Sequence, residues 1–182
     1  MSRSSTVVGN AKTNATIAQI KDLSAAINDF KSRYHYLPGD MPQAGDNIPN
    51  LSAGCNIAVG ATTTIGNGQV DTPTEVGCVA EELVRAGLIR GKTTGIFSSN
   101  NYGTNPDIFF TARRTTGLLP PTFPASTLNE IELTNQPCQT AQDIDTKLDD
   151  GNFATGNIMA SLASCTPGDS TTDPVPYLDI GF

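Results

Sequence analysis

Residues 17–40 constrain the fold of this chain more than any other stretch. Their apolar side chains recur every three or four positions, the period of one helix face, at Ile17, Ile20, Leu23, Ile27, Phe30 and Tyr34. Charged and amide side chains occupy the opposite face. Pro38 bars further helix, and the Gly39-Asp40 pair after it turns the chain. The pattern predicts an amphipathic helix over about residues 12–34.

Composition limits the kinds of protein that this chain can be. Its 182 residues suffice for one domain with its own core, and 17 glycines and 12 prolines indicate many turns and loops. The net charge of -7 and the pI near 4.5 argue against nucleic acid as a partner, because phosphates require clustered Lys and Arg. The densest basic pair, Arg113-Arg114, is interpreted as an exposed loop or a strand edge.

The cysteines favour disulfide bonds over a metal site. None of them has C-x-x-C spacing, and the single histidine, His35, is distant in sequence, so a zinc site would lack grouped ligands. An even number of cysteines in a loop-rich, acidic chain favours an oxidising, exported location. Three pairings are possible, and we favour the local one because each pair then brackets a single helical segment. It joins Cys55 to Cys78 and Cys138 to Cys165.

The remaining pattern predicts an α+β domain over residues 6–182, in which a small antiparallel sheet packs on the long helix between large loops. Residues 41–73 are rich in glycine and proline and are expected to have little regular structure. A second helix is predicted over about 74–90, with Thr74 as its cap and Gly91 as its stop.

The C-terminal half is predicted to alternate short strands with one more helix. Strands are predicted at 108–112, 127–134 and 156–163, and the last is followed by a tail rich in proline and aspartate. The third helix is predicted to start at Thr140, with Asp143 completing a weak capping box, and to end at Gly151.

Three separated segments resemble one protein family. The long helix closed by Tyr34, Tyr36 and the sequence Pro38-Gly39-Asp40 resembles the lower half of the spine helix of type IV pilins, which the pseudopilins of type II secretion systems share. Residues 81–89 (EELVRAGLI) resemble a helix in one branch of these prepilin-type proteins. Residues 141–151 (AQDIDTKLDDG) resemble a signature near the C-terminus of that branch.

The resemblance implies a pilin-like fold and a structural, non-enzymatic subunit of a type IV pilus or a type II secretion pseudopilus. Its partners would be copies of itself or other pilin-like subunits in a helical filament, together with an inner-membrane assembly machinery. The protein would be anchored in the inner membrane before assembly and would belong to a periplasmic or extracellular fibre afterwards. The apolar stripe would pack the subunit against its own sheet.

The start of the chain carries a further expectation. Residues 1–5 have no apolar core and are interpreted as a vector remnant. No transmembrane run is visible, and the prepilin leader with its cleavage motif is not present. We therefore expect that the apolar N-terminal half of a pilin helix has been removed before Thr6.

The resemblance also suggests a calcium site, because some major pseudopilins bind calcium in a loop near the C-terminus. The candidate ligands are hard oxygen donors beside Gly151, namely Asp145, Asp149, Asp150 and Asn152. The same residues also make an ordinary Asp-rich helix stop, and this alternative stays open. No other cofactor is expected.

Two other functions compete with the fibre subunit. An enzyme is disfavoured because His35 lies at a helix end, Asp149-Asp150 is typical of a solvated turn, and the glycines of 66–71 lack the lysine of a phosphate loop. A secreted or surface-displayed binding module, such as an adhesin, is the stronger rival. Its recognition surface would include Asn100-Asn101, Tyr102 and Phe123.

Overall fold

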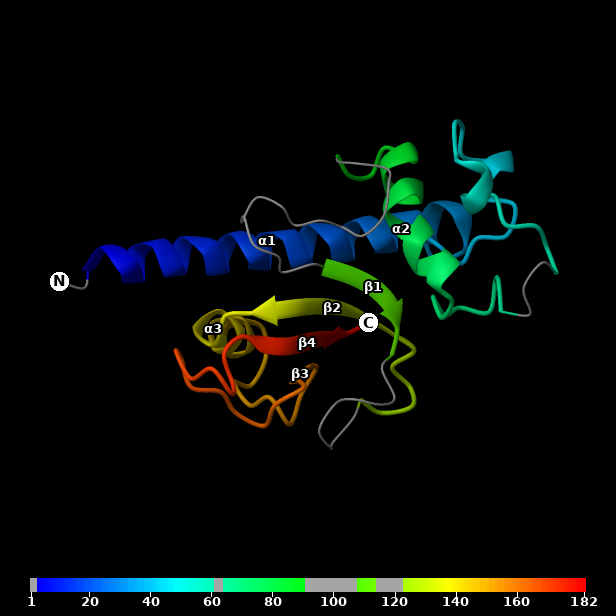
Figure 1. Ribbon diagram of the computed structural model, residues 1–182. Coiled ribbons are helices and arrows are strands. Elements are labelled where there is room, and N and C mark those ends of the chain that lie inside the picture. The colour runs from blue at the N-terminus through cyan, green and yellow to red at the C-terminus, as the bar shows by residue number, and fades with distance from the viewer. Residues whose placement is uncertain (1–2, 61–63, 91–107, 114–122) are drawn as a thin grey trace.

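A long helix lies along a small antiparallel sheet (Figure 1). The structure is a computed structural model that describes residues 3–60, 64–90, 108–113 and 123–182, with side chains from residue 10 onward. Its sheet has the strand order β1-β2-β4-β3, and all three pairings are antiparallel. The predicted α+β class is confirmed. The elements are α1 (Arg3–Tyr34), α2 (Pro73–Arg85), α3 (Cys138–Leu148), β1 (Ile108–Ala112), β2 (Asn129–Gln136), β3 (Ile158–Ala160) and β4 (Val175–Gly181).

The apolar stripe of α1 packs into the core, as the sequence predicts. Ile17, Ile20, Leu23, Ile27 and Phe30 are buried, and Tyr34 is half-buried against the same cluster. The sheet contributes the alternate residues of its strands to this cluster, including Phe110, Ile131, Leu133, Ile158 and Leu178. The predicted start of the helix near residue 12 is wrong, because α1 already begins at Arg3.

The end of α1 lies where the sequence predicts it. His35 adopts a left-handed backbone conformation with φ of 65°, and its N–H donates a hydrogen bond to the Lys31 carbonyl at 2.9 Å. His35 is exposed and caps the helix, and Pro38 follows three residues later.

The connecting segment, residues 39–72, joins α1 to α2. As predicted it has little regular structure, and its described part contains two one-turn 3-10 helices, η1 (Ala44–Asp46) and η2 (Ala53–Cys55). It is nevertheless anchored, because it contributes buried apolar side chains to the core at Met41, Ala44, Ile48, Ile57 and Val70.

Helix α2 has different ends from those predicted. Thr72, rather than Thr74, is the N-cap, and its side chain forms a capping box with Glu75. At the other end Gly87, with φ of 73°, terminates the helix before Gly91, and the N–H groups of Gly87 and Leu88 bond to carbonyls of the last turn. A glycine nearer the last buried turn was the true stop signal.

Helix α3 begins at Cys138, two residues before the predicted Thr140. Its first N–H donates to the Asp173 carboxylate at 2.9 Å, so the cap comes from a distant part of the chain. The predicted capping box of Thr140 and Asp143 is wrong, because both residues lie inside the helix.

The strand predictions succeed unequally. β1 has the predicted bounds, β2 is shifted two residues toward the C-terminus, and β3 keeps only Ile158–Ala160 of the predicted 156–163. Leu128, expected within the second strand, is 45% exposed before β2 begins. The predicted Pro- and Asp-rich tail contains β4, which lies between β2 and β3.

Both predicted disulfide bonds are present. Cys55 on η2 is bonded to Cys78 on α2, with their Cα atoms 5.3 Å apart. Cys138 at the start of α3 is bonded to Cys165, with a Cα separation of 5.7 Å. The first bond ties the connecting segment to α2, and the second ties α3 to the segment before β4.

Candidate functional sites

The candidate calcium ligands meet at the end of α3. One carboxylate oxygen from each of Asp145, Asp149 and Asp150 lies within 4.8 Å of the others. Asp145 is on the last turns of α3, and the other two follow the helix directly. The structure therefore brings these three carboxylates together, and the fourth predicted residue, Asn152, donates its N–H to the Asp150 carboxylate at 2.8 Å.

Asp145 is the unusual member of this cluster. It is only 1% exposed, and of the described groups only the Gly151 N–H offers its carboxylate a hydrogen bond. Burial, followed by the negative charges of Asp150 and Asp149, raises the pKa of Asp145 to about 6, although the Gly151 N–H opposes the shift. A buried carboxylate with so few donors is costly, so a bound cation would stabilise its charged form.

Asp149 has a structural role of its own. Its Oδ2 accepts hydrogen bonds from the Asn157 and Ile158 N–H groups, at 2.5 and 2.7 Å, and so fixes the start of β3. A Cβ atom at Gly156 would lie 2.1 Å from the same oxygen, which explains why this position is a glycine.

Asp150 and Asn152 organise the turn after α3. The Thr155 hydroxyl, and after it the Asn152 N–H, donate to the Asp150 carboxylate and lower its pKa. The Asn152 side-chain oxygen accepts the Ala154 N–H at 3.1 Å. Asn152 thus shapes the loop, and the cluster of carboxylates close to one another consists of the three aspartates.

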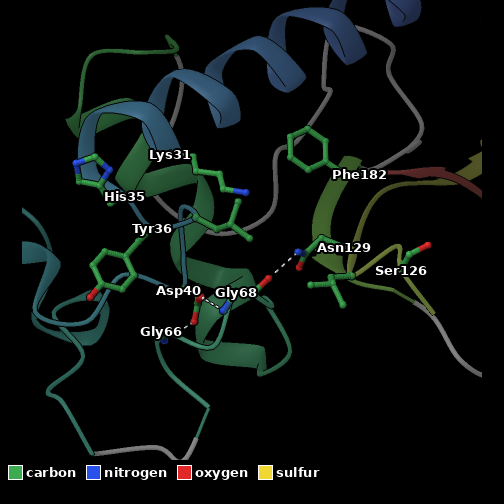
Figure 2. A pocket seen from close by; sticks show the side chains of 11 residues that line it. Lys31, His35, Tyr36, Asp40, Gly66, Gly68, Ser126, Asn129 and Phe182 are labelled. Carbon is green, nitrogen blue, oxygen red and sulfur yellow. Dashed lines mark hydrogen bonds between the residues drawn. The ribbon is translucent and has the colours of Figure 1, made fainter. Parts of the chain in front are cut away.

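A second site, which the sequence did not reveal, surrounds Asp40. Its carboxylate accepts N–H groups of Gly66, Asn67 and Gly68, at 2.5, 3.2 and 2.7 Å. Figure 2 shows the contacts with Gly66 and Gly68. Three successive amides aimed at one anion form a nest of the kind that binds phosphate in other proteins. Here the anion is the chain's own carboxylate.

A pocket of about 410 Å³ opens beside this nest, between the end of α1 and the start of β2. Asn129 closes one side, since its amide accepts the Val70 N–H and donates to the Gly68 carbonyl. The groups around the pocket combine two basic side chains with apolar ones, namely Lys31, His35, Tyr36, Leu128 and Phe182.

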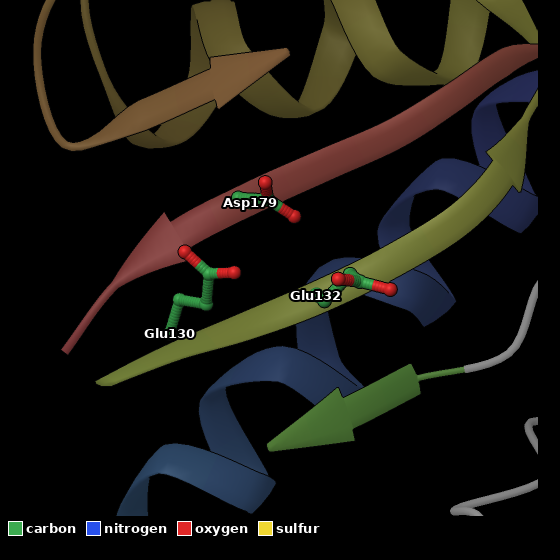
Figure 3. Close-up of side chains that lie close together, drawn as sticks. All are labelled: Glu130, Glu132 and Asp179. Atoms are coloured by element: carbon green, nitrogen blue, oxygen red, sulfur yellow. The ribbon is translucent and has the colours of Figure 1, made fainter. Parts of the chain in front are cut away.

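A third cluster lies on the sheet. Glu130 and Glu132 on β2 and Asp179 on β4 have carboxylate oxygens within 4.8 Å of one another, and all three residues are buried (Figure 3). Glu130 and Glu132 alternate with Ile131 and Leu133, which pack in the core, and Asp179 follows the core residue Leu178 and pairs with Glu132, so all three belong to the opposite face of the sheet. Each has an interaction partner. Proteins without an ion also contain such clusters, so this one by itself identifies no metal.

Of the residues expected on a recognition surface, only Phe123 lies in the described part of the chain. Phe123 is 2% exposed, so its expected place on a surface is wrong. Asn100-Asn101 and Tyr102 lie outside the described residues. Arg113 is half-buried after β1 and donates to the Phe123 carbonyl at 3.0 Å, and Arg114 lies outside the described residues.

Comparison with known proteins identifies no relative. Within the described ranges, none of the helices is both long and apolar enough to cross a bilayer. No family model, no curated protein and no solved structure matches the chain.

Proposed function

We propose that this protein is a structural subunit of a type IV pilus or a type II secretion pseudopilus. The observation that carries the proposal is the placement of α1. Its 32 residues make a helix of about 48 Å, and its first turns extend past the sheet (Figure 1). Asn10, Ala11 and Lys12 are exposed, and Thr13 is the first buried residue among the positions of the helix whose side chains the structure describes.

This placement suits a filament whose subunits contact one another through protruding helices. The later turns of α1 are occupied by the protein's own core, so they hold the head of the subunit in place. The first turns offer a surface to neighbouring copies or to other pilin-like subunits. Contacts between different surfaces of successive copies do not close, and they generate a helical fibre. The proposal includes assembly from the inner membrane into a periplasmic or extracellular fibre, without catalysis.

Cysteine cross-linking in cells that make the protein tests this proposal. Asn10→Cys and Asn14→Cys place thiols on exposed positions in the early turns of α1, and Ser170→Cys places one on an exposed loop as a control. We expect the α1 variants to give ladders of cross-linked copies or mixed products with another subunit, and the control to give monomer. Equal cross-linking at Ser170, or none at either α1 position, would contradict the proposal.

We also propose calcium as a ligand of the Asp145 cluster. The fit rests on the donor set, three carboxylates with hard oxygens, and on the burial of the Asp145 carboxylate, whose raised pKa shows that its charge is poorly compensated. Calcium takes six to eight oxygens, so carbonyl groups and water would supply the remaining ligands. Its role would be to brace the turn between α3 and β3.

A binding module is the second candidate function, and the pocket beside Asp40 favours it. Lys31 would attract an anionic group, and His35 can donate a hydrogen bond to it, while Leu128 and Phe182 supply apolar contact. Benzoate combines both properties and serves as a probe. Shifts of the Leu128 and Phe182 amide signals on titration, abolished in Lys31→Met, would support this function. Unchanged spectra at millimolar benzoate would count against it.

A further inference from the structure

Four buried carboxylates gather where the connecting segment meets α2. Asp40 and Glu81 are 1% and 6% exposed, and Glu75 and Glu82 are fully buried. Three of them lie on α2, and Asp40 lies in the turn after α1. Buried charges are normally paired with cations, so the partners of these four decide what the group does.

Their partners are N–H and hydroxyl groups of the connecting segment. The Gly39 N–H donates to Glu82 Oε2 at 2.8 Å, and both the N–H and the hydroxyl of Ser52 donate to Glu81, at 2.7 and 2.6 Å. Asp40 accepts the three amides of the nest described above. The four acids therefore fasten separate points of the segment, on both sides of the Cys55–Cys78 bond.

Glu75 completes the set at the end of the segment. Its Oε2 accepts the Asp71 and Thr72 N–H groups, both at 2.9 Å, and its Oε1 is 3.4 Å from the Thr64 hydroxyl. Asp71 adds a further negative charge close to Glu75.

The charged groups around the cluster do not neutralise it. Lys31 and His35 border the pocket beside Asp40, and Arg33 donates to the Ala86 carbonyl at the end of α2. Among the described residues, none of Lys31, Arg33 and His35 forms an ion pair with the four acids. The strand β1 and the short helix η2, which also pack on α2, carry no titratable side chain besides the bonded Cys55.

We propose that these four carboxylates make the connecting segment a pH-sensitive clasp, fastened at acidic pH and loosened at alkaline pH. Protonation of Glu82 removes its repulsion with Asp40 and Glu81, while one oxygen of its carboxyl group can still accept the Gly39 N–H. Loss of this proton leaves several negative charges buried without a cation, and opening the segment brings them into water.

The pKa directions agree with this geometry. Burial, followed by the charges of Asp40 and Glu81, raises the pKa of Glu82 to about 8, although the Gly39 N–H opposes the shift. Burial also raises the pKa values of Asp40 and Glu75. A raised pKa in the folded state means that the stabilisation is complete below the ordinary value of 4.5 for a glutamate and is lost as the pH rises through about 8.

Hydrogen exchange of single amides, followed by NMR between pH 5 and 9, tests the clasp. The reporters are the amides that donate to the four acids, at Gly39, Ser52, Gly66 and Gly68. After correction for intrinsic exchange, we expect their opening to increase about tenfold per pH unit between pH 5 and 7 if one proton controls it. The amides of β2 and β4 serve as the internal control and should lack this increase.

A substitution at Glu82 tests how much of the pH dependence comes from this residue alone. Glu82→Gln keeps an acceptor for the Gly39 N–H and removes the charge, so the pH dependence at Gly39 should fall at least fivefold. Asp22→Asn, on the exposed face of α1, is the control and should leave the dependence unchanged. If the reporter amides and the amides of β2 and β4 show the same pH dependence, the proposal is wrong. This comparison uses the wild type, so it holds even if Glu82→Gln does not fold.

Discussion

At the scale of single residues, the buried carboxylate of Asp145 on α3 gives a prediction about charge. Because the pKa of Asp145 is raised to about 6, its contribution to stability is complete below its ordinary value of 3.8 and is lost as the pH rises through about 6. Without calcium, Asp145→Asn should therefore stabilise the protein at pH 8, by about 1 kcal/mol after allowance for solvent screening. Thermal melts at pH 8 and pH 4 measure this, and the gain should shrink at the lower pH.

The same variant tests calcium. We expect millimolar calcium to raise the melting temperature of the chelator-treated wild type, because a ligand at a hundred times its Kd adds about 2.7 kcal/mol. Asp145→Asn should lose this response, whereas Asp143→Asn, which removes a charge from the same helix, should keep it. If calcium leaves the melting temperature of the wild type unchanged, the calcium proposal is wrong and the three aspartates only end the helix.

Two glycines with similar backbone conformations allow the steric cost of an added side chain to be separated from the cost of a left-handed backbone. Gly39 and Gly68 have φ of 88° and 85°. A Cβ atom at Gly39 would lie 2.4 Å from the Glu75 carbonyl oxygen, whereas at Gly68 it would meet nothing within 4 Å. Gly68→Ala should cost about 1 kcal/mol for the left-handed backbone, and Gly39→Ala about 3 kcal/mol or more. Equal urea midpoints for the two variants would refute the close contact between the turn and α2.

At the scale of elements, the start of α2 makes a prediction with a neighbouring control. Thr72→Ala should lower the free energy of unfolding by about 1 kcal/mol, because its side chain accepts the Glu75 N–H. Thr74→Ala changes an exposed residue inside the first turn and should be neutral within about 0.5 kcal/mol. Urea unfolding of both variants measures the difference, and a larger loss at Thr74 would place the cap where the sequence first indicated it.

The helix stripe and β1 were predictable because their signals are local. The start of α3 was not, because its cap is Asp173, thirty-five positions away in sequence. A sequence read locally offered Thr140 instead, since a threonine followed by an acid has the form of a capping box.

The missed strand β4 has a different cause. Pro174 and Pro176 argue against a central strand, because proline cannot donate to the ladder. In the β2–β4 pairing, Pro176 and the residue opposite it, Asn135, are not paired. Asn135 has a positive φ of 52°. β3 pairs only with Leu178, Asp179 and Ile180, so it does not reach the proline. Because the ladder is interrupted at this position, Pro176 fits in β4 although a sequence pattern would exclude a proline from a central strand.

At the scale of the whole molecule, the candidate sites also divide into those formed by neighbouring residues and those formed by residues distant in sequence. The Asp145 cluster was predictable because a single turn brings its members together. The nest around Asp40 joins residues more than twenty-five positions apart, and the sheet cluster needs the register of Glu132 opposite Asp179. The clasp likewise depends on the return of α2 onto the turn after α1. Sites of this kind depend on tertiary contacts that no local pattern specifies.

The two disulfide bonds give the last prediction, which concerns the stability of the entire domain. Their sequence separations of 23 and 27 residues correspond to about 3 kcal/mol each in the chain-entropy account. The double variants Cys55→Ser/Cys78→Ser and Cys138→Ser/Cys165→Ser should each lose about this much in urea unfolding, with a native-like circular dichroism spectrum. A domain has about 5–15 kcal/mol in total, so loss of both bonds should leave it marginal or unfolded. The first pair should in addition accelerate amide exchange in the connecting segment, because its buried apolar side chains and the hydrogen bonds to the four acids would then hold it without a covalent link. The variant that lacks both bonds could instead unfold at the same urea concentration as the wild type. The core and the clasp would then suffice for stability, and the predicted contribution of the two bonds would be wrong.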